Sequence, residues 1–284
     1  MPPHALLKVT LVELVATLVF TVLFGALVGQ KPAAGAAGGV LAGLAYFVCS
    51  AAAGPSSGGH VSPSVTASLM ASGHAAPGAG LAYLVAQVSG GLCGALVAVL
   101  TFHPRPHLAG HGDGKSPGGP LCLPSLGSAG PGWAAAAWEA GGTFVVVYCA
   151  FAYGVSKQRR ASPASTSALA APAIMGAAVA TVTAATAAAG GPAARVVHLN
   201  PSLTIASLIF DCAPGAGKAA AVHLTAQLVG AALATAAAVA ALGLWHGKDA
   251  VEVGVGVGEE EAIAPLLGRE TSPAPGLPVL GGEV

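Results

Sequence analysis

Two short polar stretches carry the residue types that could hold a neutral molecule. His-Val-Ser-Pro-Ser occupies positions 60–64 and His-Leu-Asn-Pro-Ser occupies positions 198–202, where Asn200 is the only asparagine of the chain. Their amide and hydroxyl groups offer hydrogen-bond donors and acceptors without a charge. No nucleophile–base pair, phosphate loop, metal-like cysteine spacing or nucleic-acid stripe accompanies them, so the sequence predicts no enzyme, no cofactor or metal and no nucleic-acid partner. A motif used once per half indicates duplicated halves that meet at a shared site, as in membrane channels and transporters.

The composition is typical of a protein that crosses a membrane several times. Of the 284 residues, 54% are hydrophobic and only 8% are charged, and the mean hydropathy is +0.75, whereas soluble domains carry about 25% charged residues. No Asp, Glu, Lys or Arg occurs between Pro32 and Pro104. Because one helix crosses a bilayer with about 20 residues, this uncharged interval must contain more than one crossing.

Six apolar runs are long enough to cross a bilayer. Helix is the expected conformation, because open strands would leave backbone groups unpaired in lipid. The first run, Leu6–Val28, lacks a short hydrophobic region followed by a cleavage site, so we expect it to be retained as a span. The predicted spans are approximately 6–28, 36–53, 79–102, 132–154, 167–189 and 219–245.

The charged residues are distributed unevenly along the chain. Residues 248–284 hold seven of the eleven acidic side chains and are rich in Gly and Pro, which predicts a disordered acidic tail after a transmembrane channel domain at 1–247. The basic cluster at 157–160 favours a cytoplasmic position for its loop. Over the whole six-span layout, however, basic residues divide equally between the two sides, so charge alone does not fix the orientation.

Three markers recur in the same order in the two halves, which predicts an internal duplication with copies at about 6–102 and 132–245. Each copy would contain three spans, and an odd number forces the copies to cross the membrane in opposite senses. The matching pairs are Glu13-x-x-x-Thr17 with Glu139-x-x-x-Thr143, His60…Pro63-Ser64 with His198…Pro201-Ser202, and Ala86-Gln87 with Ala226-Gln227.

Each polar stretch is followed by a segment that could form two turns of helix, at 63–70 and 201–208. Proline suits the first helical turn, and Ser or Asn is favoured just before it. Each segment is too short to span a bilayer. If the two enter from opposite sides, their positive dipole ends meet near the middle of the membrane. Such a centre repels cations and offers donors to a neutral molecule.

With these motifs the sequence resembles the aquaporin, or major intrinsic protein, family. Residues 57–66, Ser-Gly-Gly-His-Val-Ser-Pro-Ser-Val-Thr, are similar to that family's Ser-Gly-Gly-His-Val-Asn-Pro-Ala-Val-Thr in its plant vacuolar style, and Leu199–Ser202 resembles its second Asn-Pro-Ala box. The resemblance covers about residues 6–245. It implies a six-helix pore in the lipid bilayer with two re-entrant half-helices, usually a homotetramer with one pore per subunit.

The resemblance also implies three sets of site residues. The two boxes give a pore centre, the family's spacing gives an outer constriction, and the intramembrane acids and box histidines support the pore loops. We interpret the acids as structural hydrogen-bond acceptors rather than proton carriers. The pore-centre set is Ser62, Pro63, Ser64, Asn200, Pro201 and Ser202, the outer set is Ala42, Thr183, Val197 and Leu203, and the support set is Glu13, Glu139, His60 and His198.

The chain departs from the family pattern at positions that bear on selectivity. Ser62 stands where the family has asparagine, so one donor hydrogen replaces two. Ser64 and Ser202 replace alanine, and Leu203 replaces the arginine expected after the second box. The outer set therefore contains no aromatic or charged side chain, which predicts a wider and more apolar constriction. Arg195, in the loop before the second box, is an alternative source of the missing charge.

These features favour passive conduction of water or small neutral solutes such as glycerol, ammonia or hydrogen peroxide. Two alternatives stay open at this stage. One is a secondary transporter with inverted repeats, which would need coupling-ion ligands inside the membrane, and the other is a non-conducting structural membrane protein. The expected location of this integral multi-pass protein is the plasma membrane or an intracellular, for example vacuolar, membrane.

Overall fold

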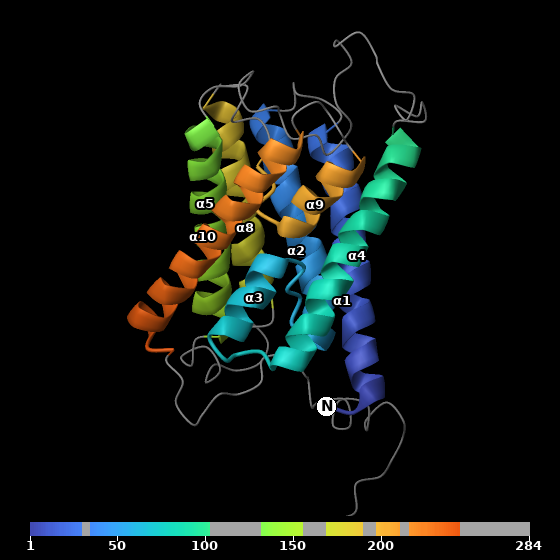
Figure 1. Cartoon of the computed structure of the whole chain (residues 1–284), viewed down its shortest axis with the longest axis vertical. Helices are drawn as coiled ribbons and strands as arrows, with labels where there is room; N and C mark the ends of the chain where they lie inside the picture. The colour runs from blue at the N-terminus through green and yellow to red at the C-terminus, as the bar shows by residue number, and fades with distance from the viewer. Residues whose placement is uncertain (30–34, 103–131, 156–168, 190–196, 211–215, 245–284) are drawn as a thin grey trace, which may run out of the picture.

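The computed structural model describes residues 1–29, 35–102, 132–155, 169–189, 197–210 and 216–244. Within these residues all regular secondary structure is helical, and the long helices stand side by side as one bundle (Figure 1). The predicted acidic tail at 248–284, the basic cluster at 157–160 and Arg195 lie outside the described residues.

Six of the described helices are long and apolar enough to cross a membrane, which confirms the predicted all-α fold with six spans. These spans contain 19 to 27 residues, close to or above the about 20 that a bilayer requires. Their bounds are α1 Pro3–Phe24, continued by the π-helical segment Gly25–Gly29, α2 Gly35–Ser57, α4 Pro77–Phe102, α5 Gly132–Cys149, continued by the π-helical segment Ala150–Val155, α8 Ala170–Ala188 and α10 Ala216–Leu242.

The second span, α2, ends later than its apolar run indicates. The hydrophobic pattern stops near residue 53, whereas the helix continues through Pro55 to Ser57. The side chain of Ser57 explains the extension, because its hydroxyl lies 3.2 Å from the Ala53 carbonyl and 2.5 Å from the Glu13 carboxylate. A hydrogen bond to an acid on a neighbouring helix thus holds a last turn that hydropathy alone does not predict.

The helices bury their polar side chains and expose their apolar ones. On α1, Glu13 and Thr17 are completely buried, whereas Leu7, Leu11 and Val15 are about half exposed. A soluble helix would show the opposite arrangement. Lipid favours apolar side chains on the outer surface, and intramembrane acids almost always face the bundle interior. The burial pattern therefore matches a bundle whose outer surface meets lipid and whose interior carries the chemistry.

Two shorter helices lie within the bundle, where the sequence predicts half-helices. They are α3, Pro63–Ala71, and α9, Pro201–Phe210. In Figure 1, α3 lies in the lower half of the bundle and α9 in the upper half. Each begins at a proline, whose fixed backbone angle and missing N–H suit the first helical position. Their 9 and 10 residues are too few for a crossing.

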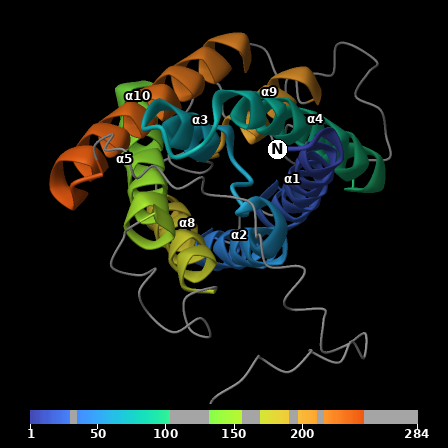
Figure 2. The same ribbon diagram turned by 90° about the horizontal axis from the view of Figure 1, so that it is seen from below.

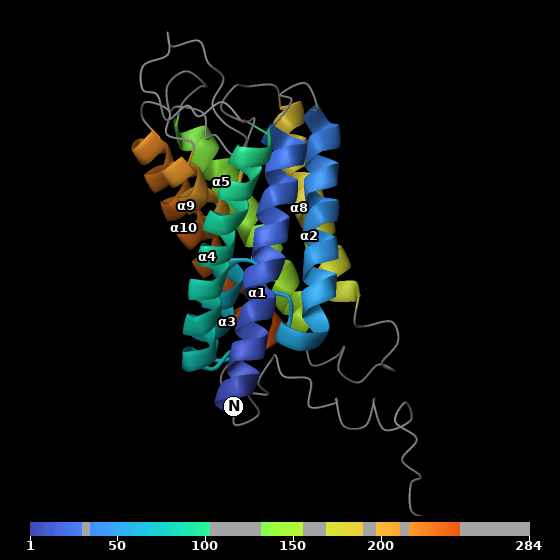
Figure 3. The same cartoon turned by 90° about the vertical axis from the view of Figure 1, so that its right-hand side faces the viewer.

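Small residues allow the long helices to approach closely. Gly43 of α2 faces the backbone of Gly176 and Ala180 on α8, so closely that an added Cβ would overlap both. In membranes such contacts supply much of the helix–helix packing, because lipid and side chains are equally apolar. α1 packs between α2 and α4 (Figure 3). Viewed from below, the connection from α2 to α3 runs through the middle of the ring of helices (Figure 2).

The α5–α10 contact yields a stability prediction with an internal control. A Cβ on Gly230 of α10 would lie 3.0 Å from the Ala140 carbonyl carbon of α5, whereas a Cβ on Gly141 would meet nothing within 4 Å. We expect Gly230→Leu to destabilise the protein by about 1–3 kcal/mol, the usual cost of overpacking, and Gly141→Leu to be nearly neutral. Thermal unfolding in detergent measures both. Equal melting temperatures for the two variants would contradict the close approach.

Candidate functional site

The two polar stretches meet inside the bundle. We call residues 58–62 the first half-loop and residues 197–200 the second half-loop. The Asn200 side chain crosses between them, because its Nδ2 donates to the Val61 carbonyl at 2.9 Å. Its Oδ1 accepts from the Ser202 backbone N–H at 3.0 Å, which caps the start of α9. One buried amide therefore links the half-loops and fixes the end of a half-helix.

A carboxylate on α1 holds the first half-loop. Glu13 accepts from the backbone N–H groups of His60 at 3.0 Å and Val61 at 2.8 Å. It also accepts from the Ser57 hydroxyl at 2.5 Å and from Gln87 Nε2 at 2.8 Å. An isolated ion at this completely buried position would be very costly, so four donors are needed to compensate it. Glu13 therefore holds the backbone of the first half-loop in place.

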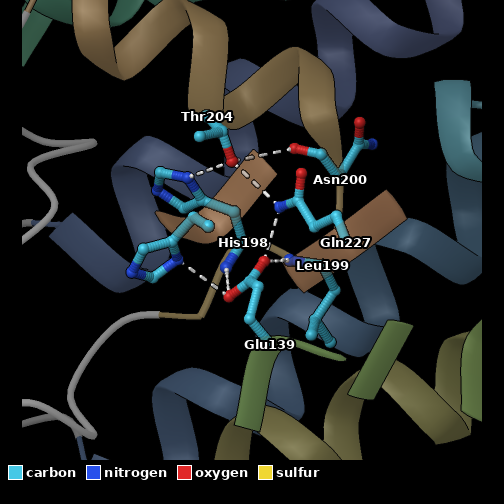
Figure 4. Close-up of polar contacts among 7 residues, drawn as sticks. Glu139, His198, Leu199, Asn200, Thr204 and Gln227 are labelled. Atoms are coloured by element: carbon cyan, nitrogen blue, oxygen red, sulfur yellow. Dashed lines mark hydrogen bonds and ion pairs between the residues drawn. The ribbon is translucent and has the colours of Figure 1, made fainter. Parts of the chain in front are cut away.

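A carboxylate on α5 holds the second half-loop in the same way (Figure 4). Glu139 accepts from the backbone N–H groups of His198 at 3.2 Å and Leu199 at 2.6 Å. Gln227 Nε2 donates at 2.5 Å, and the fourth donor is Nδ1 of His223, at 3.0 Å. Both acids thus bind two consecutive loop N–H groups and a glutamine, and the copies differ only in the fourth donor.

The two carboxylates bind segments of unusual backbone conformation. Val61 and Leu199, at equivalent places in the two half-loops, both have φ of 54°. The left-handed region costs a residue with a side chain about 1–2 kcal/mol, and it is especially unfavourable for a β-branched residue such as Val61. Each carboxylate binds the N–H of the strained residue and of the residue before it. Glu13 and Glu139 therefore bind the backbone at the two positions where it is strained.

A layer of side-chain hydrogen bonds lies between each half-loop and its half-helix. In the first copy, Thr66 Oγ1 lies 3.0 Å from His60 Nδ1 and accepts from Gln87 Nε2 at 2.9 Å. The box histidines therefore contact the start of the half-helix. In the part of the chain that the structure describes, no three His, Cys, Asp or Glu form a group that could hold a metal. The second copy repeats the layer with Thr204, His198 and Gln227, at 3.1 and 2.9 Å.

The serines that distinguish this chain are buried at the junction. The hydroxyls of Ser62, Ser64 and Ser202 make no hydrogen bond with the described part of the chain. The Ser202 side chain lies against α4, since a Cβ built on Gly91 would lie 2.9 Å from the Ser202 Cβ. Ser202 is thus at the contact between α9 and α4, while Ser62 occupies the residue before α3 without capping it.

The four residues of the outer set are all buried. Ala42, Val197 and Leu203 belong to one apolar cluster. Thr183 does not direct its donor toward them, because its hydroxyl lies 2.6 Å from the Val179 carbonyl in its own helix and 3.0 Å from the Gly39 carbonyl of α2. The surroundings of this set are therefore apolar, and the one hydroxyl among them joins α8 to α2.

Sequence reasoning missed the aromatic and hydroxyl residues that surround the half-loops. Phe24 places its ring edge-on to His198, with 6.0 Å between ring centroids. Phe20 packs edge-on against Tyr46, at 5.3 Å. A signal for both phenylalanines was present, because they follow Glu13 and Thr17 at helical spacing on the same face of α1. His223 also had a signal, since it precedes Gln227 by one helical turn.

Comparisons with known proteins give one family match and one match of the fold. Residues 3–196 match the family described as "Major intrinsic protein". The fold is similar to the X-ray structure of the aquaglyceroporin from Plasmodium falciparum, with a TM-score of 0.64 and 17% sequence identity over 82% of this chain and 95% of that chain. No curated protein matches in a direct sequence search. At this identity, the structural likeness concerns the fold alone.

Proposed function

Because this chain belongs to the major intrinsic protein family of membrane channels, we propose that it conducts water and other small neutral solutes past the junction of its two half-loops. It is a channel and not an enzyme. The observation that carries the proposal is the contact between Asn200 Nδ2 and the Val61 carbonyl, at 2.9 Å. An amide nitrogen has two donor hydrogens, so the second remains for a solute that passes the junction.

The electrostatics of the junction support a neutral permeant. The N-terminal ends of α3 and α9 begin at Pro63 and Pro201 beside the half-loops, and helix N-termini carry a partial positive charge that repels cations. Glu13 and Glu139 are each occupied by four donors, which leaves little capacity for a coupling ion. This arrangement favours passive conduction over ion-coupled transport.

The apolar outer set supports a solute range wider than water alone. Leu203 occupies the position after the second box and is completely buried beside other apolar side chains. Without a cation there, a passing solute meets few fixed hydrogen-bond donors, and pore diameter and lining donors decide selectivity in such channels. We therefore include glycerol, ammonia and hydrogen peroxide among the candidate solutes. We also propose a homotetramer with one pore per subunit, in the plasma membrane or an intracellular membrane.

Reconstituted vesicles test the function. The full chain in liposomes is exposed to an osmotic gradient of an impermeant sugar, and then to one of glycerol, while light scattering follows vesicle volume. We expect water to leave faster than from empty liposomes and glycerol to re-enter faster, with no change in proton or potassium leak. A rate that saturates and follows an ion gradient would instead indicate a transporter. Rates equal to those of empty liposomes would indicate a non-conducting protein.

A further inference from the structure

Helix α2 directs two hydroxyl groups onto the backbone of the first half-loop. The Tyr46 hydroxyl donates to the His60 carbonyl at 2.8 Å, and the Ser50 hydroxyl donates to the Gly59 carbonyl at 2.7 Å. Both side chains are buried, with 2% and 1% of their surface exposed. Two consecutive carbonyl groups of the half-loop are thus occupied by donors from a neighbouring span.

The carbonyls of Gly59 and His60 directly precede the Val61 carbonyl, to which Asn200 donates. The Glu13 carboxylate holds the half-loop through the N–H groups of His60 and Val61, whereas donors from other elements take the carbonyls. The next carbonyl along, that of Val61, accepts from Asn200. If solutes pass Asn200, as proposed above, they continue along these carbonyls, so Tyr46 stands beside their path. This step rests on the proposed function.

The Tyr46 ring packs against a second buried aromatic ring. Phe20 of α1 packs edge-on against it, with ring centroids 5.3 Å apart and an interplanar angle of 87°. Phe20 itself is 1% exposed. A ring packed on one side and hydrogen-bonded at its far end bridges the distance from α2 to the half-loop. α8, the second span of the second copy, contains no tyrosine, so it offers no counterpart of Tyr46.

We propose that Tyr46 determines which solutes pass, because its ring and hydroxyl bridge the space between α2 and the first half-loop. A solute that moves along the half-loop must displace the hydroxyl from the His60 carbonyl or pass beside the ring. The carbonyls of His60 and Gly59 each keep one free lone pair, which suits a molecule with one or two donors. The arrangement favours solutes the size of water or ammonia over glycerol, and it places the size limit at Tyr46 rather than at the outer set.

The test separates the ring from the hydroxyl. The full chain is reconstituted as wild type, Tyr46→Phe and Tyr46→Ala, with Leu44→Ala as a control, since Leu44 lies on the same helix and is 53% exposed. We expect Tyr46→Phe to raise water permeability about fivefold, because loss of one neutral hydrogen bond changes a rate by that order. We expect Tyr46→Ala to raise glycerol permeability more than water permeability, and Leu44→Ala to match the wild type.

Each other outcome has a definite meaning. If the wild type conducts and Tyr46→Ala keeps its ratio of glycerol to water permeability, or both rates fall, Tyr46 is only a brace for the loop and the proposal is wrong. If neither the wild type nor any variant exceeds empty liposomes, the proposed function fails as well. Tyr46→Phe keeps the ring and its packing, so it decides the matter if Tyr46→Ala does not yield monodisperse protein. Water permeability of Tyr46→Phe equal to that of the wild type contradicts the proposal.

Discussion

Solute flux falls at least about tenfold when Asn200 is changed to aspartate, if the amide serves the passage as proposed. The Nδ2 donor to the Val61 carbonyl would be replaced by a carboxylate oxygen, which repels that carbonyl and leaves it unsatisfied. An unsatisfied buried group costs about 1–3 kcal/mol, and each 1.36 kcal/mol corresponds to about tenfold in rate. Burial of a new charge without a partner adds to the barrier.

The substitution is informative because it removes the contact with the first half-loop and keeps the contact with α9. Aspartate keeps the side-chain oxygen that accepts from the Ser202 N–H, so the cap of α9 is retained. Leu228→Ala is a suitable control, since Leu228 is 62% exposed on α10 and faces away from the junction. Light scattering from vesicles with equal protein content gives the rates. Flux of Asn200→Asp equal to that of the wild type would show that solutes do not pass this amide.

Glu139→Gln is expected to cause a large loss of stability. The neutral amide cannot accept all four hydrogen bonds that reach the carboxylate, and its own NH2 group would face the N–H groups of His198 and Leu199. Removal of one partner from a buried, hydrogen-bonded charge typically costs about 3–5 kcal/mol. The left-handed backbone at Leu199 would also lose its support. We expect low yield and a strongly lowered melting temperature in detergent.

Glu13→Gln provides the matched measurement in the other copy. Because Glu13 binds the same kind of groups, including two loop N–H groups and Gln87, we expect a loss of similar size. Val15→Ala is the control, since Val15 is 54% exposed on the same helix and contributes little to the interior. Wild-type melting temperatures for both glutamine variants would show that the carboxylates do not support the loops.

The positions of the helices can be predicted from the sequence more directly than the side of each helix that is buried. Long uncharged runs predict the six spans, and proline after serine or asparagine predicts the two half-helices, because both signals are local. The face that each span buries is harder to predict. Lipid and interior are both apolar, so a span such as α10, rich in alanine on every side, shows no contrast between them. The apolar sequence of α2 likewise does not show that Tyr46 faces the interior, so sequence analysis missed it.

The site was predictable where chemistry restricts the residue type. A carboxylate in an apolar span needs compensation, and the paired acids therefore identify Glu13 and Glu139 as important residues. The conformation of the loops was not predictable in this way. Valine disfavours positive φ, so nothing local at Val61 indicates the left-handed backbone that distant donors and acceptors impose. The inward contact of Thr183 with Gly39 likewise depends on how closely α2 and α8 approach.

The spacing of the carboxylates and their donors along the chain has a consequence for biosynthesis. The partners of Glu13 lie 44 to 74 positions after it, and those of Glu139 lie 59 to 88 positions after it. Since the ribosome delivers the chain from its N-terminus, each acid is synthesised before all of these partners. The compensation of each acid is therefore complete only when the third helix of the same copy, which carries Gln87 or Gln227, has inserted. A chain that ends just beyond residue 102 contains every donor of Glu13, whereas the Val61 carbonyl obtains its donor, Asn200, only from the second copy.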